Sequence, residues 1–161
     1  MREYRRRIVA DICVIMCCLF VLNSCANKPL PDLAGDAIAF ETGTFIDNEH
    51  DDAAFSTIEY NGRTYIAYGT INNKYKQRYI ESCIGYIVQD EKVTSVADPR
   101  NTNWRIYTLS EDPEHNFLMD FDDTVKLMNQ PNFFRAVDTK GKDIRIPDYI
   151  DSLSYEFWED E

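Results

Sequence analysis

Three aspartates close together in the sequence, Asp120, Asp122 and Asp123, are of a type and spacing that could bind a cation. Neighbouring carboxylates supply the oxygen ligands that Ca²⁺ prefers. The glycine and the distal glutamate that complete an EF-hand calcium loop are absent around them. The sequence therefore leaves cation binding by these aspartates open, and we predict no metal site from it.

A second run of metal-ligating residue types is the Glu-His-Asp-Asp stretch at residues 49–52. Ligands in direct succession along the chain do not converge on one ion unless a fixed loop bends them together. We interpret this run as a solvated acidic linker.

The stretch from Phe117 to Val125 resembles the first motif of haloacid-dehalogenase-type phosphatases, an apolar strand followed by Asp-x-Asp-x-Thr. The resemblance implies that Asp120 is a nucleophile and Asp122 a general acid, with Mg²⁺ between carboxylates. That fold requires a parallel sheet with helical crossovers and further motifs downstream. Residues 126–161 are too few for several crossover units, and the residues before the motif predict hairpins. We therefore interpret the aspartates as a strand end beside a helix N-terminus, where acids suit the helix dipole.

A cysteine–histidine pair is the remaining catalytic possibility, and it would join Cys83 to His115 or His50. Thiol catalysis needs a partly exposed sulfur of low pKa beside a base. Cys83 instead opens an apolar run, a position typical of a cysteine that packs as a small core hydrophobe. The sequence also lacks a Gly-x-Ser-x-Gly motif and a phosphate-binding glycine-rich loop. We predict a protein that is not an enzyme and uses no cofactor, with a phosphatase-like hydrolase as the less favoured reading.

Tyrosines concentrate in the part of the chain that predicts strands, and Trp104 accompanies them. With Ile66 in the core, the alternation of side chains along a strand turns Tyr68 inward and Tyr65 outward. Outward aromatic rings can form a stacking surface for sugars or peptides. The aromatic binding surface predicted in this way consists of Tyr65, Tyr86, Trp104 and Tyr107. The alternative is that tyrosine is simply favoured in half-buried strands.

The clearest local signal is a hairpin in which residues 56–60 and 63–68 flank Asn61-Gly62. Both flanks are rich in β-branched and aromatic residues, and Asn-Gly favours a two-residue type I′ turn. Further strands are predicted at residues 83–88, 104–109, 116–121 and 133–137.

Helix signals are fewer. A short helix is predicted at residues 124–128, and another after Pro147, where Ile150, Leu153 and Phe157 recur at helical spacing. The pattern as a whole predicts a mainly β fold, a small antiparallel barrel or sandwich with one or two short helices. An α+β fold is the alternative.

The first 25 residues have the pattern of a secretory signal. Four arginines within residues 2–7 precede an apolar run from Ile12 to Leu22. This run is about half as long as the roughly 20 residues that a membrane-spanning helix needs, and its length is typical of a signal peptide. The sequence Leu22-Asn23-Ser24-Cys25 resembles the lipobox of bacterial lipoprotein precursors. The resemblance implies cleavage after Ser24 and a diacylglycerol thioether, with palmitate-type chains, on Cys25.

Two or more acyl chains hold a protein stably on a membrane. We therefore expect a lipoprotein in the cell envelope, anchored through Cys25 on the extracytoplasmic side of a membrane. Residues 1–24 would be the signal peptide, 25–52 the lipidated cysteine with a spacer, and 53–161 a single mostly β domain. The segment from Asn61 to Ile87 also resembles small lipoproteins of unassigned function. Cys83 is the one cysteine left after processing, so no disulfide is expected within the mature chain.

The formal net charge of the 161-residue chain is −11. Removal of residues 1–24, with four arginines and two acids, leaves 13 basic and 26 acidic residues, a net charge of −13. Such a surface repels nucleic acids and anionic lipid headgroups. We predict a non-catalytic binding domain for an envelope protein or a glycan. The alternative is an inhibitor or accessory subunit whose acidic surface docks onto a basic envelope protein.

Overall fold

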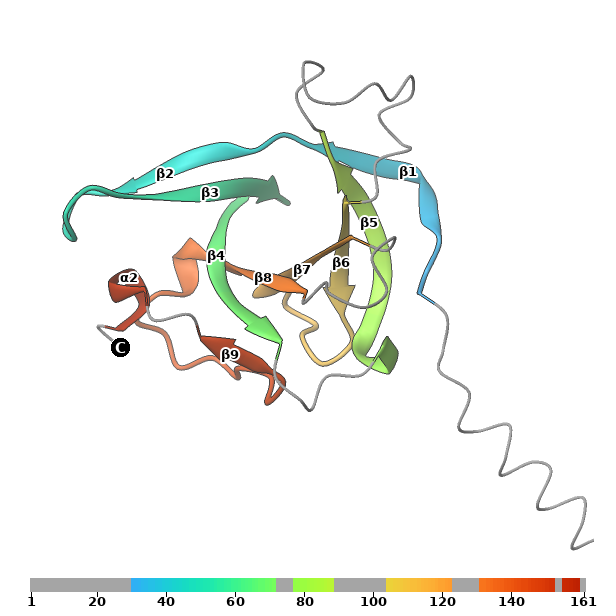
Figure 1. The fold of residues 1–161 in the computed structure, drawn as a ribbon. Coiled ribbons are helices and arrows are strands. Elements are labelled where there is room, and N and C mark those ends of the chain that lie inside the picture. The colour runs from blue at the N-terminus through green and yellow to red at the C-terminus, as the bar shows by residue number, and fades with distance from the viewer. Residues whose placement is uncertain (1–29, 72–76, 89–103, 123–130, 153–154, 160–161) are drawn as a thin grey trace, which may run out of the picture.

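The computed structural model describes residues 30–71, 77–88, 104–122, 131–152 and 155–159 (Figure 1). These residues form one large β-sheet with a few short helical turns. The strands are β1 (Leu33–Phe40), β2 (Gly43–Asp47), β3 (Ala53–Tyr60), β4 (Arg63–Ile71), β5 (Ile80–Ile87), β6 (Trp104–Leu109), β7 (Phe117–Asp122), β8 (Asn132–Ala136) and β9 (Ile150–Ser152). The helical turns are η1 (Gln77–Tyr79), η3 (Val137–Thr139) and α2 (Glu156–Glu159).

The sheet closes into a ring through its first two strands. Its order is β1-β5-β6-β7-β8-β4-β3-β2, with β9 paired to β4. Although β1 and β2 stand at opposite ends of this order, only Glu41 and Thr42 separate them along the chain. One extended segment therefore joins both ends of the sheet, as Figure 1 shows. The prediction of a mainly β, barrel-like fold is confirmed.

The pairing of β1 with β5 is parallel, whereas the other strand pairings are antiparallel. The sheet is thus mixed rather than wholly antiparallel. The difference follows from the closure, because the chain enters the sheet beside β5 and reaches β3 without turning back.

The predicted hairpin is present as β3 and β4. Asn61 and Gly62 both have positive φ angles, +50° and +73°, as a type I′ turn requires. Tyr60 pairs with Arg63 across this turn. The other predicted strands are also present, as β5, β6, β7 and β8.

The predicted boundary between spacer and domain is wrong. Residues 33–47, which the sequence assigns to the spacer, form β1 and β2 and complete the ring. Phe40 lies at the junction of these strands and is only 2% exposed. Its ring lies so close to Gly85 of β5 that a side chain at that position would collide with it. The reason for the error is that a strand buried on one side, without strict alternation, carries a weak sequence signal.

The predicted C-terminal helix is also largely wrong. Ile150–Ser152 forms β9, an edge strand whose residues pair with Gly69, Thr70 and Ile71 of β4. Gly69 permits this pairing, because a Cβ atom there would collide with the Asp151 carbonyl. Only α2 is helical. The other predicted helix, residues 124–128, lies outside the described residues.

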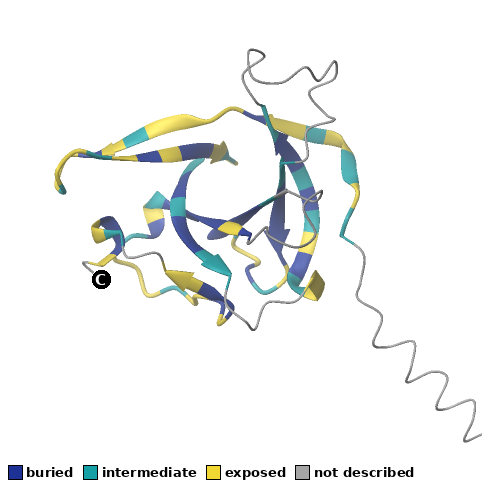
Figure 2. Ribbon diagram, in the orientation of Figure 1, coloured by how far each residue is buried: buried dark blue, intermediate teal, exposed yellow. Residues whose placement is uncertain are grey.

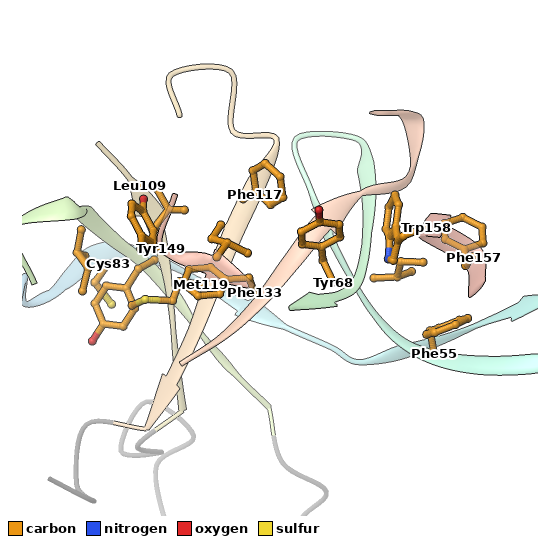
Figure 3. Close-up of a cluster of buried hydrophobic side chains, with 14 residues drawn as sticks. Phe55, Tyr68, Cys83, Leu109, Phe117, Met119, Phe133, Tyr149, Phe157 and Trp158 are labelled. Carbon is orange, nitrogen blue, oxygen red and sulfur yellow. The ribbon is translucent and has the colours of Figure 1, made fainter. Parts of the chain in front are cut away.

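Both faces of the sheet are buried against hydrophobic side chains. Alternation along β7 shows this, because Phe117 and Met119 belong to one cluster and Leu118 to the other. The first, here called the C-terminal cluster, is covered by Tyr149, Ile150, Phe157 and Trp158 and extends from Cys83 to Phe55 (Figure 3).

The second, here called the Phe40 cluster, is smaller. It contains Phe40, Ile58, Tyr65, Ile106, Leu118, Phe134 and Ala136. These residues come from β1, β3, β4, β6, β7 and β8, so the cluster links strands from all around the ring. The closing segment contributes Phe40 to it. Closure of the ring therefore also completes the burial of this cluster.

Candidate functional site

The predicted aromatic binding surface is not a surface. Tyr65 is 0% exposed, Tyr107 1% and Tyr86 9%, and Trp104 is half-buried. Tyr65 belongs to the Phe40 cluster, whereas Tyr107 belongs to the C-terminal cluster on the opposite face. The prediction assumed that one face of each strand meets solvent. Because both faces are covered, strand alternation cannot distinguish inward from outward tyrosines here.

Tyr65 instead holds the loop between β6 and β7. Its hydroxyl donates a hydrogen bond to the His115 carbonyl over 2.7 Å. Burial raises the pKa of Tyr65 to about 12, with the nearby charge of Asp112 adding to the effect. The hydroxyl therefore stays protonated at neutral pH and serves as a structural donor.

Arg63, the first residue of β4, holds the same loop. Its guanidinium donates to the carbonyl oxygens of Glu114 and His115, at 3.0 and 3.1 Å, and to Asn116 Oδ1 at 3.1 Å. It also forms a salt bridge of 2.9 Å with Asp138 in η3. A planar guanidinium can satisfy so many acceptors at once. The network ties β4, the β6–β7 loop and η3 together.

The contacts of Cys83, His115 and His50, the candidates for a cysteine–histidine pair, are with other groups. The Cys83 thiol is buried and lies 3.7 Å from the Gly85 carbonyl, in keeping with a core cysteine. The His115 ring packs against Tyr60, with 5.8 Å between centroids. His50 Nδ1 lies 2.6 Å from Asp47 Oδ2 in the turn after β2.

The acidic run at residues 49–52 is a tight turn between β2 and β3. Asp51 and Asp52 have positive φ angles, and the Glu49 N–H donates to Asp47 Oδ1. Burial acts to raise the pKa of Asp47, but hydrogen bonds from Glu49 and His50 outweigh burial, and the pKa lies below its usual value. Within the described residues, no group of three or more His, Cys, Asp or Glu side chains is arranged to hold a metal ion.

The aspartates of the phosphatase-like motif are only partly described. Asp120 is buried in β7, at 6% exposure. The strand ends at Asp122, in agreement with the predicted strand end. Asp123 and Thr124 lie outside the described residues.

A different feature distinguishes one side of the molecule. Between Lys28 and Arg63 the chain contains no lysine or arginine but eight acids: Asp32, Asp36, Glu41, Asp47, Glu49, Asp51, Asp52 and Glu59. All of them except Asp47 are exposed. They lie on β1, β2, β3 and the residues next to these strands, and β1 and β2 close the ring (Figure 2). We call residues 32–59 the acidic ribbon.

A shallow groove lies beneath the acidic ribbon. Two adjoining depressions, of about 380 and 420 Å³, share Phe45 of β2 and Val137 of η3 in their walls. The first is also lined by Arg63 and Asp138, the salt-bridged pair. The second extends along β2 to Glu49.

The wall of the second depression also includes an aromatic side chain and a basic one from outside β2. Phe157 of α2 packs edge-on against Phe45, with centroids 5.2 Å apart. Lys140 Nζ lies 4.1 Å from the centre of the Phe157 ring, and both residues line the depression. The groove therefore has an apolar floor between two strongly polar ends.

The exposed side of the β2–β3 hairpin carries small or polar residues around one large apolar side chain. Thr44 faces Ser56 and Ile46 faces Ala54 across the two strands, and all four are exposed. Ile46 is 51% exposed, the highest value among the large apolar residues described. β2 pairs with β3 along one edge. Along its opposite edge it has no paired strand in the part of the chain that the structure describes.

This region was not predicted from the sequence, because it contains neither a catalytic motif nor a cluster of exposed aromatic rings. The signal present in the sequence was the absence of lysine and arginine between Lys28 and Arg63, together with a β-prone stretch at residues 44–46. Cys25 and Ser24, the predicted lipidation and cleavage sites, lie outside the described residues.

Comparison with protein-family models, with curated proteins and with solved structures finds no match for this chain. Among the described residues, no helix has the length and apolar character needed to cross a membrane. The chemistry of the acidic ribbon and its groove is therefore the basis on which function can be argued.

Proposed function

We propose that this protein is a lipid-anchored, extracytoplasmic binding module whose acidic ribbon docks onto a basic region of an envelope protein. One observation carries the docking part of the proposal. Seven exposed acids, with no lysine or arginine among them in the sequence, lie along residues 32–59, the acidic ribbon, which includes the ring-closing strands β1 and β2. A surface of one sign steers a partner of the opposite sign and disfavours others.

The anchor is inferred from the lipobox-like sequence that ends at Cys25. Seven residues separate Cys25 from Leu33, where β1 begins. Fully extended, they span at most about 25 Å. The barrel of an anchored chain would thus stay close to the membrane, and the acidic ribbon would meet partners at or near the bilayer surface. An acidic surface does not bind anionic headgroups, which leaves it available for proteins.

Binding without catalysis is favoured over an enzyme by the roles of the reactive side chains. Cys83, His50 and Asp112 each have a structural contact, with Gly85, Asp47 and Phe117 respectively. A glycan-binding function rested on outward tyrosines, and their burial removes the reason for it.

The anchor is tested by expressing the chain and a Cys25→Ala variant in a bacterial host and separating membranes from soluble extract. We expect the unaltered chain in the membrane fraction, with the mass increase of acylation, and the variant in the soluble extract. A variant that stays with the membrane would contradict lipid anchoring through Cys25.

Docking is tested by crosslinking in intact envelopes at low and high salt. The unaltered chain is compared with a neutralised variant, in which Glu41, Glu49 and Glu59 are replaced by glutamine. We expect a crosslinked partner whose yield falls with added salt, because Coulombic attraction between exposed charges is screened. The neutralised variant should give a lower yield at low salt. A yield insensitive to both changes would contradict docking through the acidic ribbon.

A further inference from the structure

The edge of β2 lacks most of the features by which proteins protect exposed strands. Natural edge strands carry lysine, proline, a bulge or an inward charge, because unpaired backbone groups invite a further strand. Gly43–Asp47 contains neither lysine nor proline, and its register with β3 is uninterrupted. Its one inward charge, Asp47, is at the end of the strand and is occupied by the contact with His50.

The groove offers a place for side chains of an added strand. Phe45, Val137 and Phe157 form its apolar lining, and one of the two depressions follows β2 from Phe45 to Asp47 and the turn beyond it. Five residues of β2 extend over about 17 Å. This length fits an added strand of about five residues, whose alternate side chains would point into the groove.

The charge around the edge selects the occupant. Glu41 precedes β2, while Glu49, Asp51 and Asp52 follow it, and all four are exposed. Like charges on two ribbons would repel, which disfavours a second copy of this chain. A segment with lysine or arginine would be attracted.

We infer that the edge of β2 to which no described strand pairs takes up an extended, basic segment of a partner protein as an added strand, with an apolar side chain of that segment against Phe45 and Val137. The inference rests on the proposed docking function and names its mode. Main-chain hydrogen bonds supply affinity in such complexes, and alternate side chains supply specificity.

The test uses the full chain in non-ionic detergent and a capped octapeptide of alternating lysine and valine, with affinity measured by calorimetry. Two further peptides carry N-methyl groups on all lysine amides or on all valine amides. Alternate amides of a strand point to opposite edges, so only one methylated set faces β2. We expect one methylated peptide to lose at least about tenfold in affinity and the other to bind as the parent does. A glutamate–valine peptide should not bind.

A matched pair of variants tests the contribution of charge. Glu49→Gln with Asp51→Asn removes two charges from the ribbon, and Glu81→Gln with Asp143→Asn removes two exposed charges elsewhere. Asparagine tolerates the positive φ angle of Asp51. The ribbon variant should bind the lysine–valine peptide about threefold more weakly, and the control variant should bind it unchanged.

Several outcomes would overturn the inference. Equal affinity of both methylated peptides would exclude pairing along an edge, and failure of the parent peptide to bind would exclude the site. Dimers seen by sedimentation, and dispersed by one methylated peptide, would identify a second copy as the occupant. None of these results depends on the envelope crosslinking, so a failed edge site with salt-sensitive crosslinking would leave the proposed docking function intact.

Discussion

Strands β4 and β2 lie in the same sheet but are held in it by different means. β4 is buried on both faces, with Tyr65 and Ile66 each 0% exposed, and it is paired along both edges. β2 is covered on one face, through Phe45, while Ile46 on the other face is 51% exposed. β4 is fixed by its own apolar side chains, whereas β2 is fixed by its place in the closing segment.

This difference shows where a small barrel can carry function. A strand buried on both faces leaves no side chain for a ligand, however suggestive its tyrosines are. The closing segment needs only a few buried residues to complete the ring, and its other positions are free to carry charge. In this protein two of those positions, Asp36 and Glu41, carry acids, and further exposed acids follow in the turn after β2.

The largest effect should come from removing the closing segment. A chain that begins at Ala53 lacks β1 and β2 and exposes the Phe40 cluster and the edges of β3 and β5. We expect it to lose cooperative thermal unfolding, as followed by circular dichroism. A chain that lacks only residues 1–29 should keep the transition. Cooperative unfolding of the chain from Ala53 would show that ring closure is dispensable.

The same substitution in both strands should give very different results. Ile66→Ala in β4 should lower the free energy of unfolding by about 2–5 kcal/mol, because it leaves a cavity in the core. Ile46→Ala in β2 should change it by less than about 0.5 kcal/mol. Chemical denaturation measures both values. A cost at Ile46 close to that at Ile66 would mean that the exposed side of the hairpin is packed in solution.

A smaller, pH-dependent effect should separate two acids that hold turns next to these strands. Asp112 accepts the Phe117 N–H in the β6–β7 loop, and burial raises its pKa despite this bond. Asp47 ends β2, and its hydrogen bonds from Glu49 and His50 lower its pKa. Stability due to ionised Asp47 is therefore present above the usual aspartate pKa of 3.8 and lost as the pH falls below it.

The sign is opposite for Asp112. Its ionisation in the folded chain is disfavoured, so stability falls as the pH rises from 3.8 through the raised pKa. Urea unfolding between pH 3 and pH 6 measures both effects. Asp47→Asn should reduce the loss of stability on acidification, and Asp112→Asn should increase it. Equal slopes in the two variants would contradict the opposite shifts.

The strands around β4 could be predicted from the sequence, whereas closure of the ring by β1 and β2 could not. The hairpin around Asn61-Gly62 was predictable because both flanks are β-prone and the turn demands positive φ angles that these residues tolerate. Strand β5 was predictable from an apolar run of the same kind. Ring closure was not, because pairing partners distant in sequence leave no local pattern.

The site was less predictable than the fold. The alternation rule placed Tyr65 outside by assuming one solvent-facing side, and only the C-terminal residues that cover the sheet reveal the error. Those residues suggested a helix through Ile150, since helical spacing cannot show that Gly69 admits a strand alongside β4. The charge of the acidic ribbon was visible in the sequence, but its position on the closing segment was not.

Closure by the N-terminal segment also has a mechanical consequence. In a chain anchored at Cys25, tension between the membrane and a bound partner would enter the barrel at Leu33 and load the parallel pairing of β1 with β5 along the strand axis. The hydrogen bonds of a strand pulled along its axis share the load and break together, whereas a strand peeled from its end loses them one by one. A partner added at β2 would pull on the same continuous segment, so the tether and the docking edge would form one line of force. The strands that pair with neither β1 nor β2 would carry little of this load.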